Sequence, residues 1–205
     1  MSINLQKGQR IDLTKGNASL NQIMVGLGWD PVNQSSPKGG GLFGGLFGGG
    51  AKTANIDCDA SVILLQNDRI VNKGDLIYFG NKTSSCGSVR HSGDNLTGDG
   101  SGDDEVIMVD LKSVPDCYNK LVFVVNIYDC EGRKQDFGMI QNAFIRIVNP
   151  QTKQELTRFN LTDNYGGLTT LVTGEIYRHN GEWKFNAIGD GTKDRNLSEV
   201  VARYT

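Results

Sequence analysis

Residues 174–187 read Gly-Glu-Ile-Tyr-Arg-His-Asn-Gly-Glu-Trp-Lys-Phe-Asn-Ala, two strand-like runs on either side of Asn180-Gly181. Both central positions of a two-residue hairpin turn need a positive φ, which asparagine and glycine adopt readily. In the second run Trp183, Phe185 and Ala187 share one face, because successive side chains of a strand point to opposite faces. The stretch therefore predicts a β-hairpin that places these three side chains in a core.

Further short runs of apolar or alternating residues, separated by turn residues, predict more strands. The runs cover 10–14, 22–28, 64–65, 75–80, 107–109, 122–125, 143–148, 155–161, 170–178 and 182–187. Some of them, such as 122–125, are continuously apolar, which is typical of strands buried on both faces. Together they predict an all-β fold, a β-sandwich of roughly ten short strands in a single domain over residues 1–205.

The last residues of the chain break the strand pattern. Asn196-Leu197-Ser198-Glu199 resembles a helix start, with a capping residue and a glutamate three positions later. Apolar residues then recur at helical spacing, at Leu197, Val200, Val201 and Tyr204. This pattern predicts a short C-terminal helix that docks on the sandwich.

Length, charge and cysteine content favour a soluble cytoplasmic protein. A chain of 205 residues is long enough to bury a core. The net charge of −2 gives no electrostatic reason to expect nucleic acid or acidic membranes as partners. The N-terminus lacks the apolar stretch of a signal peptide, and the most apolar segment, 121–128, is far shorter than the ~20 residues of a spanning helix. The four cysteines stand singly, without a Cys-x-x-Cys pair, so we expect reduced thiols in the cytoplasm.

Residues 33–55 form a low-complexity insertion between two predicted strands. Positions 39–50 hold eight glycines in twelve residues, with Leu-Phe-Gly-Gly occurring twice. So many glycines make ordering of the backbone costly in entropy, which predicts a flexible segment. The two Leu-Phe pairs could contact a membrane or a partner, but we favour a spacer role.

Residues 92–105, Ser-Gly-Asp-Asn-Leu-Thr-Gly-Asp-Gly-Ser-Gly-Asp-Asp-Glu, place five carboxylates among four glycines, with no Lys or Arg. Crowded carboxylates repel one another unless water or a cation neutralises them. Calcium takes about 6–8 oxygen ligands, and glycines let backbone carbonyls turn toward such an ion. An EF-hand is excluded, because Leu96, Gly98 and Asp99 occupy its third, fifth and sixth places. The segment is therefore a calcium loop or a solvated acidic turn.

A second acidic pair favours the calcium interpretation. Asp57 and Asp59 begin a strand-like run and project from one face, whereas Cys58 projects from the other. The two segments together offer seven carboxylates, more than one divalent ion needs for neutralisation. We therefore expect two adjacent calcium ions. Zinc is disfavoured, because the cysteines and histidines lack the spacing of zinc sites.

The acidic segments belong to an ordered set of motifs along the chain. The set comprises Gly26-Leu27-Gly28-Trp29-Asp30, Asp57-Cys58-Asp59-Ala60-Ser61, the glycine-acid stretch 93–105, Phe144-Ile145-Arg146 and residues 174–185. This combination resembles the TerD family of tellurium-resistance and stress proteins over nearly the whole chain, except about residues 33–55. The resemblance implies a calcium-binding β-sandwich encoded with bacterial stress and tellurite-resistance genes. It also implies other proteins of such a response as partners.

We therefore expect a non-enzymatic calcium-binding module of a cytoplasmic stress response. Both acidic segments are expected to supply carboxylates, and the glycine-rich part further side-chain or backbone oxygens. The expected ligands are Asp57, Asp59, Asp94, Asn95, Thr97, Gly98, Gly100, Asp103, Asp104 and Glu105. The alternative is a metal-dependent hydrolase that uses the same acidic site, for which the sequence offers no convincing general base.

The sequence also predicts a position or a role for five residues outside this set. His91 stands shortly before the acidic stretch and can shape its entry, whereas His179, beside the Asn-Gly turn, is expected on the surface. Cys58 is expected to be a buried, inert thiol. Trp29 is expected in the core, and Asp30 can brace the metal site from a neighbouring strand.

Overall fold

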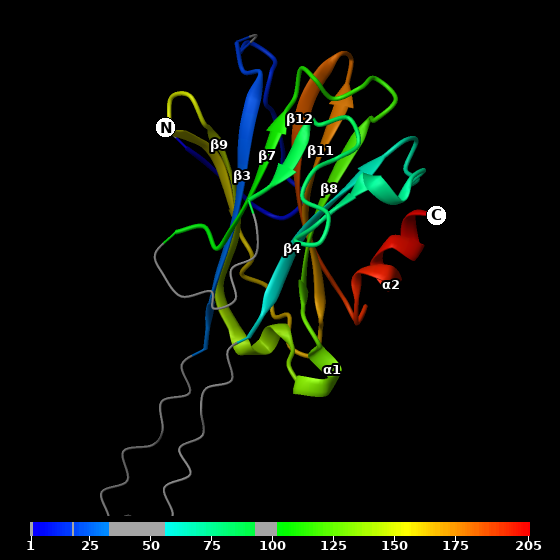
Figure 1. Cartoon of the computed structure of the whole chain (residues 1–205). Helices are drawn as coiled ribbons and strands as arrows, with labels where there is room; N and C mark the ends of the chain where they lie inside the picture. Colours follow the sequence, from blue (N-terminus) through cyan, green and yellow to red (C-terminus); the bar gives the residue numbers. More distant parts are fainter. Residues whose placement is uncertain (1, 18, 33–55, 93–101) are drawn as a thin grey trace, which may run out of the picture.

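The strands of the described residues form two six-stranded sheets that face each other as a sandwich (Figure 1). The structure is a computed structural model, and it describes residues 2–17, 19–32, 56–92 and 102–205. The all-β sandwich predicted from the sequence is confirmed. The insertion at 33–55 and the part of the acidic stretch at 93–101 lie outside the described residues.

One sheet, called here the β3 sheet, has the strand order β1-β10-β9-β3-β7-β6. Its strands are β1 (Ile3–Leu5), β10 (Gln154–Asn160), β9 (Ile140–Asn149), β3 (Gln22–Pro31), β7 (Glu105–Asp110) and β6 (Val89–His91). The other, the β4 sheet, has the order β2-β12-β11-β8-β4-β5. Its strands are β2 (Arg10–Asp12), β12 (Glu182–Thr192), β11 (Thr170–His179), β8 (Lys120–Ile127), β4 (Cys58–Leu65) and β5 (Leu76–Ile77).

The predicted hairpin is present as β11 and β12, joined at Asn180-Gly181. Its two turn residues have φ values of 53° and 79°, as the sequence requires. Trp183, Phe185 and Ala187 are all buried in the core, as predicted. At Gly174 on β11 an added Cβ would lie 2.7 Å from the ring of Phe185, so this glycine makes room for the aromatic side chain.

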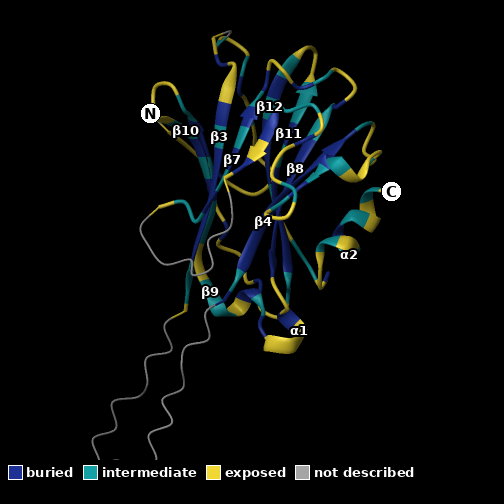
Figure 2. Cartoon of the chain, in the orientation of Figure 1, coloured by how far each residue is buried: buried dark blue, intermediate teal, exposed yellow. Residues whose placement is uncertain are grey.

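The C-terminal helix explains why β4 and β8 are apolar on both faces. Helix α2 (Leu197–Val201) begins where the side chain of Asn196 accepts a hydrogen bond from the backbone N–H of Glu199, and the 3₁₀ helix η3 (Ala202–Tyr204) follows it. It covers the outer face of the β4 sheet, and β4 and β8 are drawn as buried along most of their length (Figure 2). This outer cluster consists of Ile63, Leu65, Val122, Val124, Val172 and Val200. The predicted docking helix is therefore confirmed.

We expect the substitution Val200→Ala to lower the free energy of unfolding by about 2 kcal/mol, because it removes buried methyl groups and leaves a cavity. Val200 has no exposed surface, whereas Val71 is 59% exposed. Urea denaturation measures the change, with Val71→Ala as the control, expected within about 0.5 kcal/mol of the parent. Equal effects of the two substitutions would contradict the packing of α2 on the sheet.

The structure differs from the sequence-based expectation mainly in short elements. The strand expected at 75–80 is reduced to β5, because Asp75 instead ends the 3₁₀ helix η1 (Lys73–Asp75) and accepts a hydrogen bond from the N–H of Asn72. Strands β1 and β6 and the helices α1 (Cys130–Arg133) and η2 (Phe137–Met139) escaped prediction, because so few residues show no hydrophobic period. No helix in the described part of the chain is long and apolar enough to cross a membrane.

Candidate metal site

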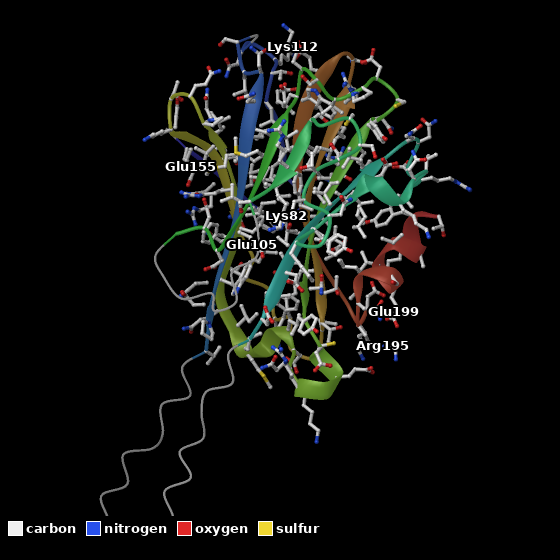
Figure 3. All side chains as sticks on the ribbon, viewed as in Figure 1. Lys82, Glu105, Lys112, Glu155, Arg195 and Glu199 are labelled. Atoms are coloured by element: carbon white, nitrogen blue, oxygen red, sulfur yellow. The ribbon has the colours of Figure 1, made fainter. Side chains whose placement is uncertain are left out.

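The five expected ligands that the structure describes stand at the starts of β4 and β7, strands of opposite sheets that are joined by the hydrogen bond between Ala60 and Glu105. Asp57 and Asp59 stand at the start of β4, and Asp103 to Glu105 lead into β7. Figure 3 labels Glu105 in the region where the green β7 begins and the cyan β4 passes. The other five expected ligands lie outside the described residues, and they are Asp94, Asn95, Thr97, Gly98 and Gly100.

Glu105 points into the sandwich and has only 1% of its surface exposed. It takes the inward place in the alternation of β7, on the same face as Ile107 and Val109. Its Oε2 accepts a hydrogen bond from the backbone N–H of Ala60 at 2.6 Å. Its Oε1 is buried and has no hydrogen-bond partner among the described residues. A buried carboxylate oxygen without a donor is unfavourable unless a cation compensates it.

His91 adds a second contact between the two sheets. Its Nε2 donates to the backbone carbonyl of Ala60 at 3.0 Å and lies 3.3 Å from Oε2 of Glu105. Within the described chain β5 pairs with β4 only at Val62 and Ile63, so no strand covers that edge of β4 at Ala60. Glu105 and His91 thus satisfy the backbone N–H and C=O of Ala60 in place of a neighbouring strand. The histidine expected at the entry of the acidic stretch therefore lies inside the sandwich.

Asp104 directly precedes β7 and is only partly buried. Its Oδ2 accepts a hydrogen bond from the backbone N–H of Trp29 at 2.7 Å. Burial, together with the negative charges of Asp30, Asp103 and Glu105, raises the pKa of Asp104 to about 6. Removing a proton from this group near neutral pH leaves a charge that a cation would stabilise.

We expect calcium affinity to fall as the pH is lowered through about 6, because protons then compete for Asp104. The stability of the metal-free fold changes in the opposite direction. The raised pKa of Asp104 contributes stability that is fully present below the ordinary carboxyl pKa of 3.8 and is lost as the pH rises through about 6. Calcium titrations on either side of this pH test the expectation. Affinity that is unchanged or higher on the acid side would contradict it.

Asp103 anchors the end of the acidic stretch on the outer face of the β3 sheet. Its two carboxylate oxygens accept from Nε and Nη2 of Arg146, at 2.7 and 2.9 Å. Arg146 also binds Glu155 at 3.2 Å, and Arg158 binds the same glutamate at 3.4 Å. Glu155 is labelled in Figure 3 on the outer side of the β9–β10 pair. A bidentate arginine–carboxylate pair restricts the position of the carboxylate as well as stabilising its charge. The pair with Arg146 therefore holds the segment before β7 in place.

Gly26 on β3 leaves the space that Asp103 fills, because an added Cβ would overlap its carboxylate. We therefore expect Gly26→Ala to displace Asp103 from Arg146, to lower the free energy of unfolding by about 1–2 kcal/mol and to weaken calcium binding roughly tenfold. Denaturation and calorimetry measure the two effects. Gly102→Ala is the matched control, because its added Cβ would meet nothing within 4 Å. Indistinguishable behaviour of the two variants would contradict the anchoring role.

The remaining acidic pair lies at the start of β4. Oδ2 of Asp57 is 3.5 Å from Nη1 of Arg133, and Asp59 is 4% exposed. Between them Cys58 is fully buried. Its burial first, and then the charges of Asp59, Asp57, Glu105 and Asp104, raise the pKa of its thiol well above the ordinary value. The expected burial of this thiol is thus confirmed, and these four predicted ligands all lie close enough to Cys58 to act on it electrostatically.

No three histidine, cysteine, aspartate or glutamate side chains converge as a metal-binding group among the described residues. The described candidate ligands stand at the starts of β4 and β7, and residues 93–101 lie outside the described part of the chain. The full ligand set and the number of ions therefore stay predictions. The donor chemistry fits a hard cation, because the described candidate ligands are all carboxylates and one buried oxygen of Glu105 lacks a donor.

The structure also places the residues outside the ligand set. Trp29 is in the core, as predicted, with 5% of its surface exposed, and His179 is exposed at the hairpin. Asp30 accepts a hydrogen bond from Nδ2 of Asn142 at 2.9 Å and adds negative charge near Asp104. Sequence reasoning missed the pairing of Arg146 with Asp103, although Arg146 was part of the motif set. The capping of Ala60 by Glu105 was also missed, because no local pattern signals it.

Comparison with known proteins gives consistent results over the whole chain. The family model described as "TerD domain" matches residues 1–204. The stress response protein SCP2 of Bacillus subtilis (strain 168) is 61% identical over 204 residues, covering 100% of both chains. The general stress protein 16U of the same organism is 45% identical over 205 residues, covering 100% of this chain and 97% of that protein. The tellurium resistance protein TerD of Serratia marcescens is 40% identical over 205 residues, with the same coverage of 100% and 97%.

A solved structure supports the fold. The crystal structure of a homologue of telluride resistance protein (TerD) from Streptomyces coelicolor A3(2) superposes with a TM-score of 0.61. The match covers 87% of this chain and 94% of that chain at 20% sequence identity. The two chains therefore share the two-sheet architecture.

Proposed function

Because the chain belongs to the TerD family of tellurium-resistance and general stress proteins, we propose that it is a calcium-binding module of a bacterial stress response. In this proposal the metal joins the two sheets at the start of β4 and β7, and the bound form acts as a structural or interaction unit. The module is not an enzyme. Its expected place is the cytoplasm, and its expected partners are other proteins of the same response.

The observation that carries the proposal is the environment of Glu105. Its carboxylate is buried between the sheets, and its Oε1 has no hydrogen-bond partner among the described residues. Asp104 lies next to it with a pKa raised to about 6 by burial and by like charges. Two carboxylates so placed favour a divalent cation, and oxygen-only donors favour calcium over softer metals.

The residues of the two acidic segments would hold the ion. Asp104 and Glu105 supply the described carboxylates nearest β7, and Asp57 and Asp59 those nearest β4. Oxygens from the stretch that contains Asp94 to Gly100 complete the expected shell. Bound calcium would neutralise the negative charge of these carboxylates.

A hydrolase using the same ion would need a general base near the metal. The chain has two histidines. His179 is exposed at the far hairpin, and His91 uses Nε2 to hold the carbonyl of Ala60. These placements support the non-enzymatic proposal.

A calorimetric titration of the chelator-stripped full chain with calcium, repeated in excess magnesium, tests the proposal. We expect saturable binding in the micromolar range or tighter, which magnesium does not displace, because magnesium demands a smaller, octahedral site. The stoichiometry then counts the ions. Absence of binding heat together with absence of stabilisation by calcium would refute the proposal.

A further inference from the structure

The helix α1 carries a cationic side chain to one of the candidate calcium ligands. Nη1 of Arg133, the last residue of α1, lies 3.5 Å from Oδ2 of Asp57. The side chain of Asp57 is 13% exposed, and that of Arg133 is 38% exposed. Figure 1 shows α1 at the end of the sandwich where β4 begins, directly after Asp57. A positive charge of the chain itself therefore lies beside a carboxylate that is expected to bind the metal.

The local backbone fixes the position of this arginine. The backbone N–H of Tyr128 donates to the carbonyl of Asp57 at 2.8 Å, which ties the segment before α1 to the candidate ligand. The backbone N–H of Arg133 donates to the carbonyl of Asp129 at 3.0 Å. Lys134 has a φ of 55°, a left-handed conformation that commonly ends a helix, so α1 stops after one turn. Arg133 is thus held on a short turn beside Asp57.

The pair of Arg133 and Asp57 is looser than the pair of Arg146 and Asp103. Arg146 contacts both carboxylate oxygens of Asp103 through two nitrogens, at 2.7 and 2.9 Å. Arg133 places one nitrogen at 3.5 Å from one oxygen of Asp57. Bidentate pairs are strong and directional, whereas a single contact to a partly exposed arginine adds little stability. The Asp103 pair is therefore suited to anchoring, and the Asp57 pair is suited to exchange for another cation.

Arg133 also has two partners on its own turn. Its Nε lies 4.0 Å from Oδ2 of Asp129, and its guanidinium carbon lies 5.1 Å from the centre of the Tyr128 ring. Gly132 leaves the space for the Asp129 carboxylate, because an added Cβ would lie 2.6 Å from its Oδ1. The ion-pair and cation–π contacts both remain available when the guanidinium moves away from Asp57. Leaving Asp57 therefore costs Arg133 only one of these three contacts.

We propose that Arg133 is a built-in competitor of calcium at Asp57 and thereby sets the affinity of the site. Because Asp57 is a metal ligand only in the proposed function, this role of Arg133 rests on that function. In the metal-free chain the guanidinium offsets part of the charge of Asp57, and it moves toward Asp129 and Tyr128 when the ion binds. Two cations at one carboxylate repel each other, so a cation that must first be displaced lowers the apparent affinity.

Calorimetry of chelator-stripped variants tests the competition. Arg133→Gln removes the competing charge and should raise the calcium affinity roughly threefold, which is the size of the effect of a partly exposed ion pair. Arg69→Gln is the matched control, because it makes the same change of net charge at an exposed arginine beyond the other end of β4. Arg133→Lys keeps the charge and should stay closer to the parent than Arg133→Gln does. A merely structural role of Arg133 would instead lower the affinity of Arg133→Gln.

The arginine Nε–H resonances of the ¹⁵N-labelled full chain report the movement directly by NMR. The Arg133 resonance, identified by its loss in Arg133→Gln, should shift with added calcium and saturate at the stoichiometry that calorimetry gives. Arg203 is the internal reference, because it binds both carboxylate oxygens of Asp194, at 2.6 and 2.9 Å, outside both acidic segments. Its resonance should stay in place.

The results also separate this role of Arg133 from the calcium proposal. Absence of calcium binding by the parent would refute both together. When the parent binds calcium, the role of Arg133 alone is overturned if Arg133→Gln binds no more tightly than Arg69→Gln. It is equally overturned if the Arg133 resonance stays in place at saturating calcium.

Discussion

Replacing Asp104 by Asn and Glu105 by Gln in one chain should abolish calcium binding in the micromolar range. The pair contributes the carboxylate with a pKa near 6 and the buried carboxylate whose Oε1 lacks a donor among the described residues. Both substitutions keep the shape of the side chain and remove its charge, so they remove the attraction for a cation. Losing two charged ligands of one ion should weaken binding by more than roughly a hundredfold. Calorimetry of the chelator-stripped variant measures the loss.

The matched control removes the same number of carboxylates elsewhere. Asp116 and Asp190 have side chains that are 100% and 64% exposed, outside both acidic segments. The variant Asp116→Asn with Asp190→Asn changes the net charge equally and should bind calcium like the parent. Circular dichroism checks that the site variant stays folded. Parent-like calcium binding by a folded Asp104→Asn, Glu105→Gln variant would contradict the assignment.

Calcium should stabilise the folded chain strongly. Asp104 and Glu105 repel each other when no ion neutralises them, and an ion that binds only the folded state adds stability by mass action. At a free calcium concentration roughly a thousandfold above the dissociation constant, the gain is about 4 kcal/mol per site. For a chain of 205 residues this corresponds to a rise in Tm of roughly 10 °C.

Thermal unfolding in calcium and in chelator measures this gain. The Asp104→Asn, Glu105→Gln variant serves as the control and should show a similar Tm in both conditions. Magnesium should stabilise the parent far less than calcium does. Equal Tm values of the parent with and without calcium would contradict the account, as would an equal response of parent and variant.

Much of the fold was predictable because its signals are local. The Asn180-Gly181 turn, the alternation at Trp183 and Phe185, and the cap at Asn196 each act within a few residues. The length of β3 was underestimated, since its glycines and Trp29 interrupt the alternation while its pairing with β9 extends to Pro31. Tertiary pairing, not local preference, decides such boundaries.

The candidate site was only partly predictable, because its key contacts join distant residues. The acidic composition pointed to Asp104 and Glu105, but nothing local shows that Glu105 turns inward and caps Ala60, a residue 45 positions away. The requirement for glycine at position 26 becomes apparent only when the structure shows the carboxylate of Asp103, paired with Arg146, in the space of a Cβ. Such contacts follow from the meeting of β4 and β7, which becomes visible only when the two sheets are assembled.

The most direct test of the account is the crystal structure of the full chain grown with calcium. The account predicts one or two ions beside the starts of β4 and β7, with carboxylate oxygens of Asp104 and Glu105 among ligands at about 2.3–2.6 Å. Anomalous scattering would identify the metal. An acidic stretch that is hydrated and free of metal at saturating calcium, or a calcium ion bound elsewhere on the sandwich, would contradict it.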